Sequence, residues 1–137
     1  MATLREPGPP AFFATAARAG AVNDAVRAVC QDILGGGGDD TKRVDGDGVP
    51  ALAYSPKMVE AALPRLSQKV VAAVQALDEG RAFKFVASVV LVENTGGGGG
   101  LHKGSAALWN ADTDSSCVVR WENASLIVVA TIFALAV

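Results

Sequence analysis

Residues 83–137 decide the fold, and they read FKFVASVVLVENTGGGGGLHKGSAALWNADTDSSCVVRWENASLIVVATIFALAV. Four apolar or alternating runs in this stretch are rich in Val, Ile and Phe, as β-strands are. The residues between them are mostly Gly, Asn, Asp and Ser, which favour turns. Because connections this short cannot hold a parallel crossover, we expect a four-stranded antiparallel sheet. Its predicted strands are residues 83–92, 101–109, 116–122 and 125–137.

Two amphipathic helices are expected before this sheet. Apolar side chains recur at helical spacing over residues 22–34, and a run of glycines beginning at Gly35 ends that helix. A second helix begins at the N-cap Ser55 with Pro56 in its first turn, and Gly80 ends it. This order predicts an α+β domain with both helices on one sheet face. The apolar positions are Val22, Val26, Val29 and Ile33, then Val59, Leu63, Leu66, Val70, Val74 and Leu77.

Pro64 interrupts the pattern of the second helix. Inside a regular helix a proline removes one hydrogen bond and crowds the carbonyl four residues earlier, at about 3 kcal/mol. Either the helix kinks at Pro64, or residues 55–63 form a separate turn and the main helix starts at Pro64. We expect a kink or a break.

By its length the chain is one domain. Residues 1–18 are rich in Ala and Pro without sustained periodicity, and they are expected to form a flexible arm. In this arm Phe12 and Phe13 could pack on the domain or on a neighbour. Residues 19–137 form the domain, and residues 35–53 are expected to be a Gly-rich and Asp-rich loop inserted into it.

Both faces of the first predicted strand are apolar. Val86, Val90 and Val92 alternate with Phe85 and other large side chains, so each face needs a cover. The two helices can cover only one face. A second subunit is expected to cover part of the other.

Metal and phosphate sites are excluded by spacing. A calcium loop aligned on Asp45 and Asp47 would place Arg43 and Tyr54 at ligand positions. Neither glycine run has Gly next to Lys, as a phosphate-binding loop requires. Two cysteines, Cys30 and Cys117, are too few and too scattered for a disulfide framework or a metal site. No cofactor and no metal are therefore expected.

An enzyme is not expected either, because the single histidine, His102, has no Cys or Asp at a suggestive spacing. Arg120 and Glu122 flank Trp121 and should form a polar pair at a sheet edge or interface. Asn123 begins an Asn-Ala-Ser glycosylation pattern, which we set aside because it falls in a tight hairpin.

Charge and hydropathy limit the partners and the location. The net charge of −2, without a basic stripe, argues against nucleic acid and membrane surfaces. The longest apolar run, residues 126–137, is shorter than the roughly 20 residues of a membrane span. The N-terminal residues lack the pattern of a secretory signal. An intracellular protein is expected.

Four motifs in residues 83–137 resemble the Tctex-type dynein light chain family. The family has an FKY-like start, a GLH triplet, an FWD-like turn and a C-x-V-R-W-E-N run at much the same spacing. The helical region resembles the family only loosely, and Pro64 and residues 35–53 depart from its pattern. The motifs are Phe83-Lys84-Phe85, Gly100-Leu101-His102, Leu108-Trp109-Asn110-Ala111-Asp112-Thr113-Asp114 and Cys117-Val118-Val119-Arg120-Trp121-Glu122-Asn123.

The resemblance implies a non-catalytic light chain of a dynein motor complex. In this family the second strand, here residues 101–109, crosses to the sheet of the sister subunit, and a dynein intermediate-chain segment adds beside it by β-augmentation. The glycines at 96–100 suit a strand that must leave its own sheet. The implied partner-binding residues are Leu101, His102, Lys103, Gly104, Ser105, Ala106, Ala107, Leu108 and Trp109, and the expected dimer interface includes Phe85, Leu101, Leu108, Trp109 and Trp121.

The expected partners are a dynein intermediate chain and a second light chain, in a homodimer or a heterodimer. The expected location is the cytoplasm and cytoskeleton. The glycine-rich insertion and the Ala/Pro arm favour the ciliary or flagellar axoneme. The alternative is a roadblock-like dimeric adaptor outside dynein. The order of the elements argues against it, because two helices precede all the strands.

Overall fold

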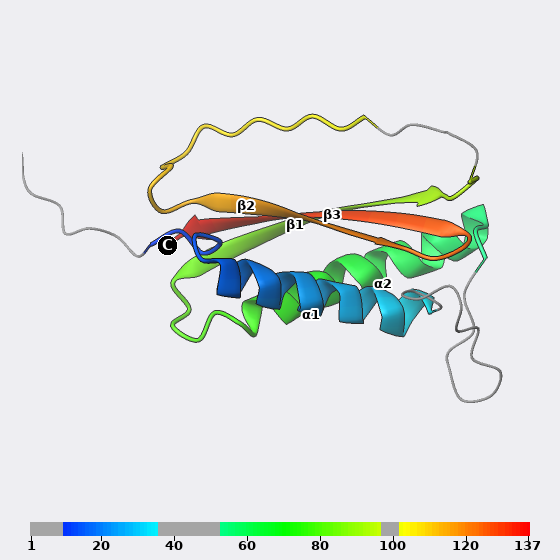
Figure 1. Ribbon diagram of the computed structural model, residues 1–137, viewed down its shortest axis with the longest axis horizontal. Coiled ribbons are helices and arrows are strands. Elements are labelled where there is room, and N and C mark those ends of the chain that lie inside the picture. The colour runs from blue at the N-terminus through cyan, green and yellow to red at the C-terminus, as the bar shows by residue number, and fades with distance from the viewer. Residues whose placement is uncertain (1–9, 36–52, 97–101) are drawn as a thin grey trace, which may run out of the picture.

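Two helices cover one face of an antiparallel sheet in the computed structural model, which describes residues 10–35, 53–96 and 102–137 (Figure 1). The helices are α1 (Ala16–Leu34) and α2 (Pro56–Gln75). The strands are β1 (Phe83–Glu93), β2 (Ser115–Glu122) and β3 (Leu126–Ala136). This arrangement confirms the α+β class and the position of the helices on one side of the sheet.

The sheet contains three strands within the described residues, so the prediction of four is corrected. Its order is β1-β3-β2, and both pairs are antiparallel. Residues 102–109, predicted as a strand, are unpaired here, and position 101 lies outside the described residues. β1 pairs with β3 along all of Phe83–Glu93, and its other edge has no partner strand within the described residues. Small residues such as Gly104 and Ser105 offer little apolar area to stabilise a hairpin on that edge.

The central strand β3 supplies most of the sheet side of the core. Its side chains alternate between the two faces, as in any strand. Leu126, Val128, Ala130, Ile132 and Ala134 are buried toward the helices. The register places Ala130 opposite Val89 of β1 and Val119 of β2, so these strands contribute their odd-numbered residues to the same face. This fixes which side chains lie on the other face.

Helix α1 starts at Ala16, earlier than the predicted residue 22. Thr15 is its N-cap, and the Thr15 hydroxyl accepts a hydrogen bond of 3.2 Å from the Arg18 N–H. The helix ends at Leu34 as predicted, and Gly35 follows with a φ of 65°, which favours glycine. The fully buried stripe is Val22, Val26, Cys30 and Leu34, whereas the predicted Val29 and Ile33 are half-buried beside it.

Helix α2 runs as one helix through Pro64, so the predicted break there, with a main helix starting at Pro64, is wrong. Ser55 caps it as predicted, and the Ser55 hydroxyl accepts a hydrogen bond of 3.1 Å from the Met58 N–H. In the turn that holds the proline, the Ser67 hydroxyl donates to the Leu63 carbonyl at 2.9 Å. The buried face consists of Ala62, Leu66, Val70 and Val74. The helix ends at Gln75, before the predicted Gly80.

The N-terminal residues from position 10 pack on the domain. Phe12 is only 3% exposed and contacts the rings of Phe83 and Phe85 at centroid distances of 5.3 and 5.0 Å. The Arg18 guanidinium lies 4.4 Å from the centre of the Phe12 ring. Of the two sequence alternatives, packing on the domain is therefore observed. The rest of the predicted arm, residues 1–9, lies outside the described residues, as do residues 36–52 of the predicted insertion and the glycines at 97–100.

No helix within the described ranges is both long and apolar enough to cross a membrane.

Candidate protein-binding surface

The sheet face that points away from the helices, here called the outer face, is largely apolar. It carries Val86, Val90 and Val92 of β1 and Ile127, Val129 and Phe133 of β3. Part of it is open to solvent, because Val86 is 52% exposed and Val118 of β2 is 64% exposed. Two polar side chains, Ser88 and Thr131, lie opposite each other near its middle. A largely apolar surface of this kind is typical of a protein-binding site.

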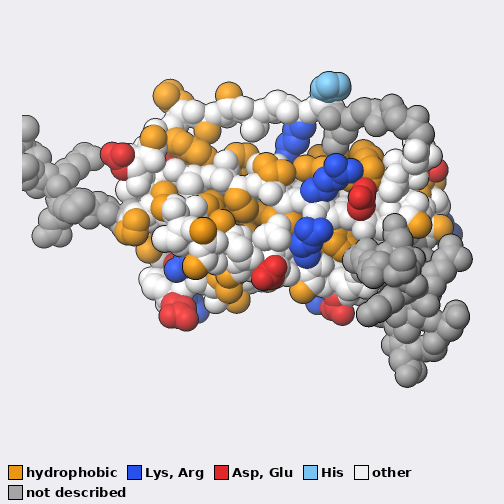
Figure 2. All heavy atoms as spheres, viewed as in Figure 1, with side chains coloured by type: hydrophobic (Ala, Val, Ile, Leu, Met, Phe, Trp, Pro, Cys, Tyr) orange, Lys and Arg blue, Asp and Glu red, His pale blue; other side chains and the backbone are white. Residues whose placement is uncertain are grey.

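Residues 102–109, here called the extended segment, cross over this outer face (Figure 1). The side chains of residues 102–108 are exposed, and Leu108 is fully so. Over part of its length the segment stands away from the sheet in the space-filling view (Figure 2). The segment therefore has little packing against the described part of the chain.

Two side chains attach the extended segment to the sheet. The Lys103 ammonium donates a hydrogen bond to the Thr131 hydroxyl. The Trp109 ring meets the Phe133 ring in a T-shaped contact with centroids 6.0 Å apart. Both attached residues have odd numbers, as expected if alternate side chains of an extended backbone point the same way. His102, Gly104, Ala106 and Leu108 accordingly belong to the opposite side of the segment.

The backbone of the extended segment makes no hydrogen bond with a strand in the described part of the chain. It therefore presents a row of N–H and C=O groups in strand-like conformation. Such groups can pair with another extended chain, and this is the basis of strand addition.

The turn that follows the segment fixes the point at which the segment leaves the sheet. The Asp114 carboxylate accepts hydrogen bonds from the N–H of Ala136 at 2.8 Å and from the N–H of Asn110 at 3.1 Å. The Asn110 side chain in turn accepts from the Asp112 N–H at 3.1 Å. Sequence reasoning identified this turn but missed the role of Asp114. The sequence did contain a signal for this role, because Asp and Asn side chains often close turns in this way.

Asn123 joins the β2–β3 hairpin to two other elements. Its side-chain oxygen accepts from the N–H groups of Ser125 and Leu126 at 2.8 and 2.7 Å. Its amide nitrogen donates to the Gly35 carbonyl after α1 at 3.1 Å. Its own carbonyl accepts from the Asn94 side chain just after β1 at 3.0 Å. Since Asn123 is 2% exposed, its role is structural and its side chain is not accessible for glycosylation.

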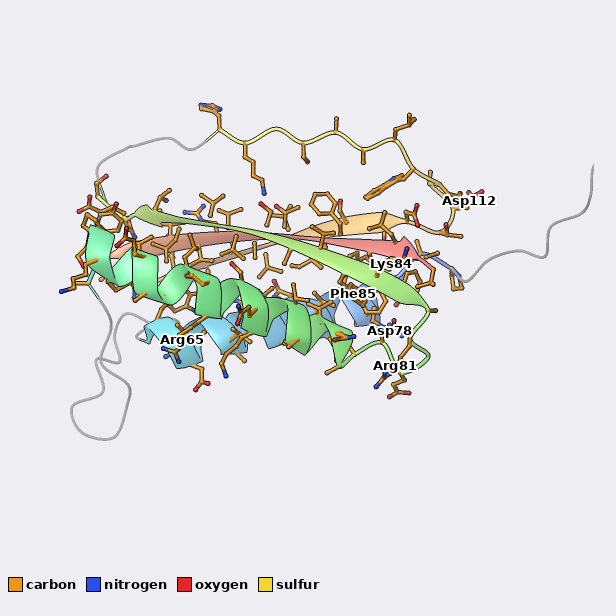
Figure 3. All side chains as sticks on the ribbon, turned by 180° about the vertical axis from the view of Figure 1, so that it is seen from behind. Arg65, Asp78, Arg81, Lys84, Phe85 and Asp112 are labelled. Carbon is orange, nitrogen blue, oxygen red and sulfur yellow. The ribbon has the colours of Figure 1, made fainter. Side chains whose placement is uncertain are left out.

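The structure divides the predicted interface residues between the two sheet faces. Leu108 and Trp109 lie in the extended segment over the outer face. Phe85 and Trp121 lie on the helix side, where Trp121 is 3% exposed and Phe85 contacts Phe12 (Figure 3). We therefore leave Phe85 and Trp121 out of the proposed interface.

The polar pair predicted on β2 is confirmed. The Arg120 guanidinium and the Glu122 carboxylate are 3.2 Å apart, and both side chains are mostly exposed. An exposed ion pair contributes little to stability, at most about 1 kcal/mol. Its significance lies in the polar rim that it gives to the apolar outer face.

The two thiols are not activated. Burial raises the pKa of the Cys30 thiol to about 11 and also raises the pKa of Cys117. Both therefore stay protonated and weakly nucleophilic near neutral pH. Within the described residues no group of three or more His, Cys, Asp or Glu side chains could hold a metal ion.

The sequence of this chain is similar to that of known proteins. The model of the Tctex-1 family matches residues 48–135. A Tctex-type dynein light chain of Drosophila melanogaster is 39% identical over 59 residues, which are 43% of this chain and 51% of that protein. The human Tctex-type 3 dynein light chain is 31% identical over 58 residues, or 42% and 48% of the two chains. A Dictyostelium discoideum relative is 32% identical over 53 residues, or 39% and 46%. The chain spans about half the length of these curated relatives.

Proposed function

The chain belongs to the Tctex-1 family, and we propose that it is a non-catalytic light chain of a dynein motor complex. The observation that carries this proposal is the extended segment, an unpaired strand-like stretch lying over an apolar sheet face. Its fully exposed Leu108 and its free backbone groups are suited to pairing with another chain. Family membership also argues against the roadblock-like alternative.

The light chain acts as a dimer in which residues 101–109 of each subunit pair with the sheet of the other. Within the described ranges two sheet edges have no neighbouring strand and could receive this one, those of β1 and β2. We take β2 as the receiving edge, because its eight residues, Ser115–Glu122, match the length of the segment. Residues 127–133 of β3 and the outer-face residues of β2 beside them, such as Val118, would then be covered by the second subunit. Leu101, Leu108 and Trp109 would form part of the interface.

A segment of the dynein intermediate chain adds beside the exchanged strand. Main-chain hydrogen bonds there contribute affinity without sequence preference, so side chains on alternate positions select the partner. The docking residues are Leu101, His102, Lys103, Gly104, Ser105, Ala106, Ala107, Leu108 and Trp109. The complex would act in microtubule-based movement at the cytoskeleton, with the ciliary or flagellar axoneme favoured by the glycine-rich insertion.

The test combines sedimentation equilibrium of the full chain with titration of a dynein intermediate-chain peptide. We expect a dimer at micromolar concentration and saturable peptide binding. Ser105→Pro should abolish peptide binding, because proline removes a ladder donor and distorts the edge. A monomer of about 14 kDa would exclude strand exchange, and unchanged peptide binding by the proline variant would exclude docking on this strand.

A further inference from the structure

The strand β1 presents a second free edge, on the side of the sheet opposite β2. The order β1-β3-β2 leaves one side of Phe83–Glu93 without a neighbouring strand in the described part of the chain. When the molecule is viewed from behind, β1 lies in front with α2 beneath it (Figure 3). The extended segment lies over the outer face of the sheet and not beside β1 (Figure 1).

This edge lacks the usual protection against pairing. Natural edge strands are short, charged, bulged or interrupted by proline. Here β1 has 11 residues in continuous register with β3, without a bulge. Its only charged side chains, Lys84 and Glu93, lie near its two ends, and between them every residue except Ser88 is apolar. Val86, at 52% exposure, adds an accessible apolar side chain.

We propose that the β1 edge is a second docking site, which binds an extended peptide of a partner protein antiparallel to β1. Antiparallel pairing is favoured because it is slightly more stable per residue than parallel pairing. Opposite charges facing each other across two strands are stabilising. The peptide that fits carries an acidic residue opposite Lys84, a basic residue opposite Glu93, and alternating apolar residues between them. Its basic end is then its N-terminal end.

A second copy of this chain fits the edge less well. When two identical antiparallel strands are related by a two-fold axis, each residue lies opposite a residue from the same side of the sheet. Even-numbered residues therefore lie opposite even-numbered residues. Lys84 belongs to the outer face and Glu93 to the helix side. The two charges therefore cannot face each other in such a pair. This charge arrangement favours a partner of different sequence.

The test uses the full chain and a fluorescent ten-residue peptide with an N-terminal Lys, a C-terminal Glu and alternating Val and Thr between them. We expect saturable binding and hydrogen-exchange protection of amides in β1. Lys84→Glu should weaken binding about two- to fivefold, and a peptide ending in Lys should restore it. Protection of β2 amides, or no binding at millimolar peptide, would overturn the proposal.

A matched pair of variants separates this edge from the one used for strand exchange. Val86 on β1 and Val118 on β2 are both exposed valines on the outer face. Val86→Lys should weaken binding of the probe peptide about two- to fivefold and leave the dimer intact, whereas Val118→Lys should leave probe binding unchanged. If Val86→Lys abolishes the dimer, or if both variants reduce probe binding equally, β1 is not a separate docking edge. Should Val86→Lys fail to fold, the charge reversal at Lys84 decides the question alone.

Discussion

Trp109 packs edge-on against Phe133, with ring centroids 6.0 Å apart, and so holds the end of the extended segment on the central strand. The contact lies directly before the turn that Asp114 closes. The segment is thus fixed at the end that enters β2. Near the other end of the segment, the Lys103 ammonium donates a hydrogen bond to the Thr131 hydroxyl. Between these two side-chain contacts the backbone is unpaired within the described residues, and such a strand is suited to exchange between subunits.

The first prediction concerns this aromatic contact. Trp109→Ala should lower the free energy of unfolding by about 1–2 kcal/mol, because it removes an aromatic pair and apolar burial. Leu108→Ala is the matched control, and it should change little in the monomer because that side chain is fully exposed. Urea denaturation of both variants at a concentration that favours monomers would measure the difference. Equal effects at the two positions would show that the Trp109 contact does not hold the segment.

Asn123 gives the second prediction. Asn123→Ala should lower the free energy of unfolding by about 2–4 kcal/mol, since it leaves the Gly35 carbonyl and two hairpin N–H groups without partners. Asn94→Ala, which removes the side-chain hydrogen bond to the Asn123 carbonyl, should cost about 1 kcal/mol. Thermal and urea unfolding would compare them. A loss at Asn123 no larger than that at Asn94 would mean that this residue does not tie the three elements together.

The third prediction tests the two sides of the extended segment. Ala107 shares its side with Lys103 and Trp109, which reach the outer face, whereas Ala106 lies on the other side. Ala107→Glu would direct a charge toward apolar side chains and should weaken intermediate-chain binding about tenfold. Ala106→Glu should leave that affinity within about twofold. Titration of the peptide into each variant, with sedimentation of the dimer as a control, would decide.

If both glutamate variants bind the intermediate-chain peptide as tightly as the parent chain, the extended segment is not the docking strand. If both variants lose the dimer, the segment contributes to the subunit interface on both of its sides.

The fold class was predictable because the hydrophobic periodicities are strong and local. The helical spacing around Val70 and the apolar run of β3 indicate their elements without tertiary information. The number of strands was not predictable in the same way. A run such as residues 101–109 has turn residues on both sides and some strand character, but whether it pairs depends on which edge is free. Here β3 lies between β1 and β2, a non-local outcome that no local pattern specifies.

The stretch of sequence that forms the extended segment was predictable, but its contacts with the sheet were not. The position of the extended segment came from family motifs around Leu101 and Trp109, whereas the contact of Lys103 with Thr131 depends on two residues far apart in sequence. Phe85 and Trp121 were also expected at the interface. Alternation in their strands places both toward the helices instead, and the register needed to see this comes only from the sheet.

The last prediction follows from the buried thiol of Cys30. Burial raises its pKa from 9.0 to about 11, because the thiolate would lose its hydration inside the core. The raised pKa means that the folded state favours the protonated thiol. Its contribution to stability is therefore complete below about pH 9 and is lost as the pH rises toward 11. Stability should fall in this alkaline range.

Urea unfolding between pH 8 and 11 would measure this loss, and Cys30→Ala would serve as the control. The variant should be less stable at every pH, and its stability should depend less steeply on pH because the contribution of the Cys30 thiol is gone. Some pH dependence should remain, because other groups that titrate at alkaline pH are present in both proteins. Iodoacetamide should label Cys117 before Cys30 in the folded chain, since Cys117 is only half-buried. Identical pH profiles of parent and variant, or rapid labelling of Cys30 without denaturant, would show that this thiol is not held in the core as the structure places it.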